Sequence, residues 1–148
     1  MNGLPWGFKT DIRGKTLVGV RHVKNEPDNW RYSSSVDIVL DFADGTRTSY
    51  YASGDCCSTS WVEHVTVPDL GSGATVLDLK DSGGLDATEE QEAQTKEAYV
   101  ARGDKYGPEC LRVYHTSIVT DKGEVIIEYR NDSNGYYGGS LEETNRWD

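Results

Sequence analysis

The clearest pattern in the chain is an alternation of apolar and polar positions over residues 36–42. Val36, Ile38, Leu40 and Phe42 fall on one face of this run, and the residues between them fall on the other. A period of two residues is typical of a β-strand that buries one face. The run therefore predicts a strand that packs one side against a core.

Turn residues separate this run and others into two predicted β-hairpins. Asp44-Gly45 can adopt the positive φ angles of a tight hairpin turn, and Asp121-Lys122-Gly123 marks a second turn. The runs that these turns connect are residues 36–42 with 46–51, and residues 110–120 with 124–130. Further β-rich runs predict strands at residues 17–23 and 75–80.

Two four-residue patterns have the form of a capping box, in which two side chains satisfy the free amides at a helix start. Residues 60–63 (Ser-Trp-Val-Glu) predict one or two helical turns that end before Pro68. Residues 86–89 (Asp-Ala-Thr-Glu) predict a helix over residues 87–102 that Gly103 closes. Acidic residues dominate the first half of this second helix and its apolar stripe is thin, so we expect it on the surface.

These elements predict an α+β fold: a twisted, mainly antiparallel sheet of five to seven strands, one short helix and one acidic surface helix. The 148 residues fit a single domain, residues 1–148, in which residues 81–109 form an insertion between two strands. No run approaches the length of a membrane span. The first residues lack the basic and apolar blocks of a secretory signal, so we expect a cytoplasmic protein.

Charge narrows the classes of partner. The formal net charge is −10, with +3 on residues 1–31 and −13 on residues 32–148. An acidic surface repels nucleic acid and anionic membranes, because both are bound by neutralising phosphates. We therefore expect neither as a partner. The acidic excess is consistent with solubility alone, and it also fits a basic protein partner.

The densest group of reactive side chains lies in residues 53–65, which contain Cys56, Cys57 and His64. Adjacent cysteines do not match the spacing of zinc ligands, and Cys110, His22 or His115 would have to complete such a site from other strands. A nucleophilic thiol with a histidine base is a second possibility. We favour a third interpretation, in which the cysteines and Trp61 bury against the sheet. We expect neither a bound metal nor a cofactor, and no catalytic residue is assigned.

The block Asp55, Cys56, Cys57, Trp61 and Glu63, flanked by the two hairpins, resembles a family of small bacteriophage-encoded proteins that have no assigned activity. The resemblance covers residues 36–80, with support from residues 110–130. It implies an origin in a phage genome and a site of action in the host bacterial cytoplasm or in a virion. It implies no chemistry.

Tyrosines and acids supply the candidate contact surface. Tyrosine is common at recognition surfaces because it offers a large area with few torsions to freeze. The predicted contact residues are Tyr136, Tyr137 and Trp147 in the tail, and Glu89, Glu90 and Glu92 in the acidic helix. The leading hypothesis is a non-catalytic, phage-type accessory protein that binds a host or phage protein.

Three alternatives belong to other classes. One is a virion component, such as a decoration or minor tail protein. Another is a protein that sequesters a small anionic ligand, for which Lys9, Arg13, Lys15 and Arg21 would supply positive charge. The third is a metal- or thiol-dependent enzyme that uses Cys56, Cys57, His64 and Cys110.

Overall fold

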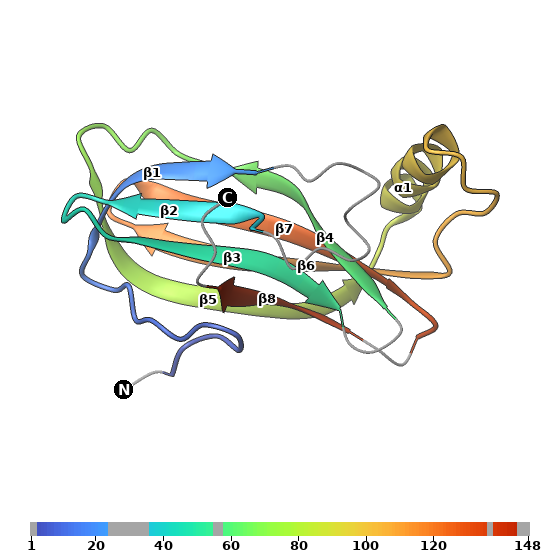
Figure 1. Ribbon diagram of the computed structural model, residues 1–148, viewed down its shortest axis with the longest axis horizontal. Coiled ribbons are helices and arrows are strands. Elements are labelled where there is room, and N and C mark those ends of the chain that lie inside the picture. Colours follow the sequence, from blue (N-terminus) through green and yellow to red (C-terminus); the bar gives the residue numbers. More distant parts are fainter. Residues whose placement is uncertain (1–2, 24–35, 55–57, 136–137, 145–148) are drawn as a thin grey trace.

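Eight β-strands in one antiparallel sheet and a single helix make up the regular structure of the computed structural model, which describes residues 3–23, 36–54, 58–135 and 138–144 (Figure 1). The strand order is β4-β7-β6-β5-β1-β2-β3-β8. The elements are β1 (Thr16–His22), β2 (Ile38–Phe42), β3 (Arg47–Gly54), β4 (Thr59–Thr66), β5 (Ala74–Asp86), α1 (Glu89–Ala101), β6 (Cys110–Thr120), β7 (Gly123–Ser133) and β8 (Gly139–Thr144).

The sheet curls on itself, so that its edge strands β4 and β8 approach each other at one end. The Ser58 hydroxyl donates a hydrogen bond to the Gly138 carbonyl over 3.4 Å. Gly139, at the start of β8, lies so close to β4 that a Cβ there would be 2.5 Å from Ser60 Oγ. Glycine is required at this position because any side chain would collide with the facing strand.

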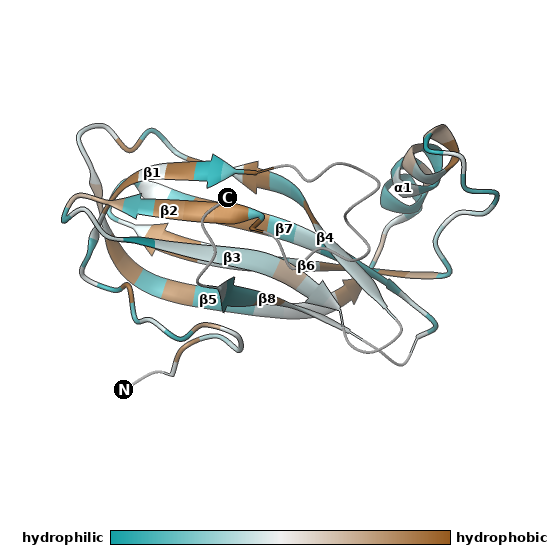
Figure 2. Cartoon of the chain, in the orientation of Figure 1, coloured by the Kyte–Doolittle hydropathy of each residue, from teal (hydrophilic) through white to brown (hydrophobic). Residues whose placement is uncertain are grey.

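The inner face of the curled sheet encloses the core. Apolar side chains from both halves of the sheet pack there in one cluster. Members with no exposed surface include Ile38, Leu40, Ile118, Ile127 and Tyr50. Burying an aliphatic side chain of this size contributes roughly 1.5–3 kcal/mol to folding. Figure 2 shows hydrophobic residues concentrated on β2 and on parts of β1 and β5, whereas α1 is mixed in character.

Both predicted hairpins are confirmed. β2 and β3 pair antiparallel around Asp44-Gly45, where Gly45 has a φ of 86° and its N–H donates to Phe42 O at 3.0 Å. β6 and β7 pair in register over their whole length around the Asp121–Gly123 turn. The strand predicted over residues 36–42 is confirmed as β2, but its one-sided burial is not, because Asp37 and Val39 on the other face are buried as well.

The predicted short helix at residues 60–63 is wrong, and so is the α+β class. The segment is part of β4, which pairs with β7. Ser60 and Val62 are buried and Glu63 is exposed, which follows the two-residue period of a strand. The neighbouring valines and threonines also favour a strand. Ser60 accepts a hydrogen bond from Asn131 on β7 and caps no helix. The protein is mostly β, with eight strands rather than five to seven and one helix rather than two among its described residues.

The acidic surface helix is confirmed, with a later start than predicted. Its N-cap is Thr88, whose hydroxyl accepts from Gln91 N at 3.1 Å, while Gln91 Oε1 accepts from Thr88 N at 2.9 Å. Asp86 is unavailable as a cap because β5 extends to it, through Gly83 and Gly84, which lie in the predicted insertion at residues 81–109. A Cβ on Gly84 would lie 2.5 Å from the Tyr114 ring, so the glycine admits this tyrosine.

Candidate functional site

Helix α1 lies at the end of the sheet where β5 stops and β6 begins (Figure 1), and its side chains contact the outer face of β4 and β7. Two of its side chains, Thr95 and Tyr99, are buried. They contact three residues of the sheet: Trp61 on β4, and Arg130 and Asp132 on β7. These five residues are called the outer cluster below.

Arg130 is the most deeply buried charge of the outer cluster, with 4% of its surface exposed. Its Nε and Nη2 atoms contact Glu128 Oε2 at 3.0 and 2.9 Å, and Nη1 lies 3.6 Å from Glu63 Oε1. Nη1 also donates to Thr95 Oγ1 at 2.9 Å. A buried guanidinium is tolerated only when it is paired and hydrogen-bonded, and here both conditions are met.

Asp132 connects α1 and the returning chain to the sheet. Its Oδ2 accepts from the Tyr99 hydroxyl at 2.8 Å, and its Oδ1 accepts from the N–H groups of Glu109 and Cys110 at 3.0 and 3.4 Å. Burial and the bond to Asp132 raise the pKa of the Tyr99 hydroxyl, which keeps it protonated as a donor. The Arg102 guanidinium stacks 4.2 Å from the centre of the Tyr99 ring.

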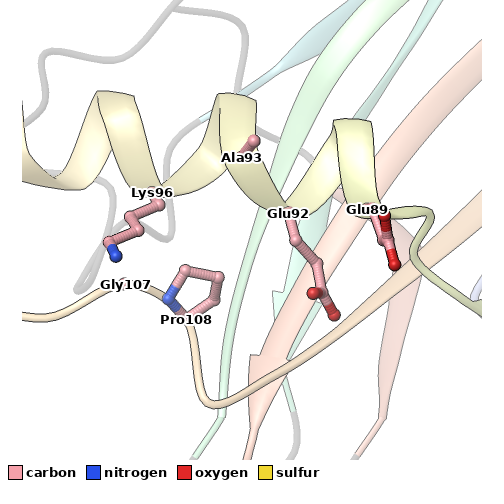
Figure 3. A pocket seen from close by; sticks show the side chains of 6 residues that line it. All are labelled: Glu89, Glu92, Ala93, Lys96, Gly107 and Pro108. Carbon is pink, nitrogen blue, oxygen red and sulfur yellow. The ribbon is translucent and has the colours of Figure 1, made fainter.

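A groove of about 360 Å³ runs between α1 and the chain that returns to β6. In Figure 3 the carboxylates of Glu89 and Glu92 and the amine of Lys96 project to the side of the helix where Gly107 and Pro108 pass. The lining residues are Glu89, Glu92, Ala93, Lys96, Gly107 and Pro108. A Cβ on Gly107 would lie 2.9 Å from Lys96 Cγ, so the glycine lets the chain pass close to the helix.

The groove and its surroundings are acidic. Glu89, Glu90 and Glu92 are exposed in the first turn of α1. Acidic side chains at a helix N-terminus stabilise the helix by interacting with its dipole. This effect explains the acids of the first turn, but it does not explain why a groove lies beside them. Residues 85–109 contain seven acidic and three basic side chains, a net charge of −4.

The structure separates the predicted thiol and metal residues that it describes. His64 is exposed on β4 opposite Glu128, whereas Cys110 is partly buried opposite Ser133. Glu128 and Ser133 are five positions apart on β7, or about 17 Å along a strand. Cys56 and Cys57 lie outside the described residues, as do Tyr136, Tyr137 and Trp147. No three His, Cys, Asp or Glu side chains in the described part of the chain are grouped to hold a metal ion.

A family model described as "Domain of unknown function (DUF7448)" matches residues 11–142. The chain belongs to the DUF7448 family. No curated protein and no solved structure matches it.

The residues matched by the DUF7448 model include the groove. The matched residues run from before β1 into β8, and they include α1, the outer cluster and all six groove residues. The groove therefore lies inside the family domain.

Among the described residues, no helix has the length and apolar character to cross a membrane.

The residues of the outer cluster were not singled out from the sequence, with the exception of Trp61. Arg130 ends the run at residues 124–130 that predicts a strand, and alternation places it on the face opposite Tyr129, whereas Asp132 lies two residues beyond that run. The pattern of the strand does not show that a helix contacts this face, because that contact depends on the path of residues 87–109. The sequence signal that was available is that Arg130 and Asp132 continue the two-residue period of the predicted strand.

Proposed function

We propose that this DUF7448 protein is a non-catalytic binding module whose partner is a protein that presents basic and apolar side chains. The observation that carries the proposal is the groove, because its concave surface is lined by carboxylates and the chain segments that adjoin it carry exposed apolar side chains. Lysine and arginine side chains of a partner would pair with Glu89 and Glu92. Such complementarity favours fast and selective association.

Exposed apolar side chains next to the groove support a protein partner rather than a small cation. Tyr106, which precedes Gly107, is 72% exposed, and Val100, one helical turn after Lys96, is 53% exposed. Leu85, at the end of β5 before the helix, is 63% exposed. Aromatic and aliphatic residues at a rim of charge are characteristic of surfaces that bind proteins.

The outer cluster supports the proposal through preorganisation. Hydrogen bonds from Arg130 and Asp132 fix α1 against the sheet, and Asp132 also fixes the backbone at residues 109 and 110, just after Pro108. Both walls of the groove are thus attached to one strand, β7. A binding surface that is ordered before the partner arrives loses less entropy on association.

The resemblance to phage proteins suggests the setting: a host or phage protein as partner, encountered in the host bacterial cytoplasm. It remains a prediction that the tail residues Tyr136, Tyr137 and Trp147 contact the same partner. A virion component remains the alternative. Mass spectrometry of purified particles distinguishes the two, since a structural protein would be present at defined copy number.

The test compares a charge-reversed groove with a matched control. Partners captured from a bacterial lysate by the wild type are identified, and a binding peptide from one of them is labelled for fluorescence anisotropy. We expect Glu89→Lys/Glu92→Lys to weaken binding by about tenfold or more, as expected for two rim charges, with the wild-type affinity falling as salt rises. The control is Glu97→Lys/Glu124→Lys, which changes charge equally at exposed positions that do not line the groove. Equal binding by both double variants would refute the proposal.

A further inference from the structure

The groove beside α1 carries charge of both signs. Glu89 and Glu92 supply its carboxylates and Lys96 supplies its cation, and all three residues are exposed. In Figure 3 the amine of Lys96 lies beside Gly107, whereas both carboxylates lie nearer the start of the helix. The groove therefore has a negative end and a positive end.

The charge of Lys96 is not neutralised by the acid one helical turn away. Glu92 is four positions before Lys96, a spacing at which ion pairs commonly form on a helix. Among the described residues, however, neither side chain takes part in an ion pair or a hydrogen bond, whereas Arg102 of the same region is ion-paired with Asp104. Both charges of the groove are thus available to a partner.

The chain that returns to β6 fixes the direction of the Lys96 side chain. A Cβ on Gly107 would lie 2.9 Å from Cγ, 3.1 Å from Cβ and 3.3 Å from Cδ of Lys96, so the glycine leaves room for this methylene stem. A long cationic side chain can lay its stem on a neighbouring surface and keep its charged end in water. Contact along the stem restricts the torsions that place the ammonium group, which therefore has a defined position in the groove.

The separation of the two charges sets the spacing that a bound segment needs. Glu92 and Lys96 are four residues apart on α1, or about 6 Å along the helix axis. In an extended chain, side chains two positions apart lie on the same face, about 6.6 Å from each other. A groove of about 360 Å³ holds a few side chains of one segment rather than a folded element. An extended segment with a basic and an acidic residue at positions i and i+2 therefore matches both ends.

We propose that the groove binds an extended segment of the partner in which a lysine or arginine stands two positions from an aspartate or glutamate. The basic side chain pairs with Glu89 and Glu92, and the carboxylate pairs with Lys96. This inference rests on the proposed function and adds a requirement to it, since the partner must present an acid as well as a base. Lys96 then determines specificity, because it attracts the mixed segment and repels one that carries basic residues only.

Selection from a randomised peptide library tests the requirement without knowledge of the natural partner. Peptides are selected in parallel on the full-length wild type and on Lys96→Glu. We expect the wild type to enrich a basic and an acidic residue two positions apart, and the variant to enrich a second basic residue in place of the acid. The control is Lys80→Glu, which makes the same charge change at an exposed position that does not line the groove and should select as the wild type does.

Fluorescence anisotropy with one peptide selected on the wild type measures the contribution of Lys96. Lys96→Glu should weaken binding by about fivefold or more, as expected when an exposed attraction becomes a repulsion. Replacing the acid of the peptide by lysine should recover most of this loss. Lys96→Met keeps the stem against Gly107 and removes the charge, so it should bind the peptide and its acid-to-amide counterpart equally.

The outcomes separate this inference from the proposed function. Enrichment of basic residues without an acid, or the same selection by the wild type and Lys96→Glu, would overturn the role of Lys96 and leave a groove for basic segments. Enrichment of the acid four positions from the base would indicate a helical segment and contradict the extended one. No enrichment of basic residues, or binding that survives Glu89→Lys/Glu92→Lys, would overturn the proposed function itself.

Discussion

The two faces of strand β7 hold the protein together in different ways. On the inner face, Val125, Ile127 and Tyr129 are buried in the apolar core. On the outer face, Arg130 and Asp132 attach α1 through hydrogen bonds, and Arg130 is ion-paired with Glu128 on its own strand. Apolar burial is non-directional and supplies most of the free energy of folding. Buried ion pairs offset much of their own desolvation, so they fix a position more than they stabilise a fold.

This difference predicts two levels of stability in one molecule. The curled sheet should unfold as a cooperative unit, because its core is shared by both halves. Helix α1 should open at a lower free energy, since it buries only Thr95 and Tyr99. A binding surface built on such a helix is ordered in the native state and can still adjust to a partner.

The largest change in the free energy of unfolding is expected from a substitution that creates a cavity in the core. Ile127 has no exposed surface and packs among other aliphatic side chains. Ile127→Ala should lower the free energy of unfolding by about 3 kcal/mol, because it removes buried methyl groups and leaves a partly unfilled space. Urea denaturation measures the change, with an unchanged slope showing that the two-state transition is preserved.

Ile127→Val is the matched control for this cavity and should cost about 1 kcal/mol. A loss below 1 kcal/mol for the alanine variant would show that the inner face is not the main source of stability, and the contrast between the two faces would collapse.

A second prediction compares two carboxylates. Asp132 accepts three hydrogen bonds in the outer cluster, whereas Asp37 is buried just before β2, where its Oδ2 accepts from Ala52 N at 2.8 Å. Burial raises the pKa of Asp37 to about 6, above its ordinary value of 3.8. The neutral form is therefore the one that the folded state favours.

The sign of the pH dependence follows from this raised pKa. Below about pH 4 the carboxyl is protonated in both states. Between pH 4 and 6 the unfolded chain loses this proton before the folded chain does, so stability falls as pH rises. A shift of about two units corresponds to about 3 kcal/mol. Above pH 6 the loss is constant.

Asp37→Asn should remove that loss, because the amide is neutral at every pH and its oxygen can still accept from Ala52 N. Urea denaturation of both proteins at pH 4, 5, 6 and 7 gives the measurement, and other titrating groups cancel in the difference. We expect the variant to gain about 2–3 kcal/mol relative to wild type between pH 4 and pH 7. A difference that stays flat across this range would place Asp37 in a solvated environment.

Sequence pattern predicts the parts of the fold that local chemistry determines. Asp44-Gly45 specifies its hairpin because the turn and both flanking strands agree. The acidic helix is also specified locally, since Thr88 and Gln91 provide a capping box two residues after the one expected. In both cases the residues that decide the structure are neighbours in the chain.

The remaining features depend on contacts between distant residues. Residues 60–63 satisfy the pattern of a helix cap and that of a strand, and only pairing with β7 decides between them. Ser60 and Asn131 are 71 positions apart, and the register of β4 and β7 is needed to bring them together. The acids of the groove were identified from the sequence, but its opposite wall, at Gly107 and Pro108, follows from the return path of the chain.

The smallest change in free energy is expected from removing one hydroxyl of the outer cluster. Tyr99→Phe removes the 2.8 Å bond to Asp132 and keeps the ring against Trp61 and Arg102. Losing one such bond costs about 1 kcal/mol, a factor of about five in an equilibrium. Hydrogen exchange should therefore be about fivefold faster for amides of α1 and unchanged for those at the centre of β6 and β7. Tyr106→Phe, at an exposed tyrosine, is the control and should change neither. If the sheet amides accelerate together with those of the helix, then α1 opens only with the whole domain, and the outer face contributes to global stability as the inner face does.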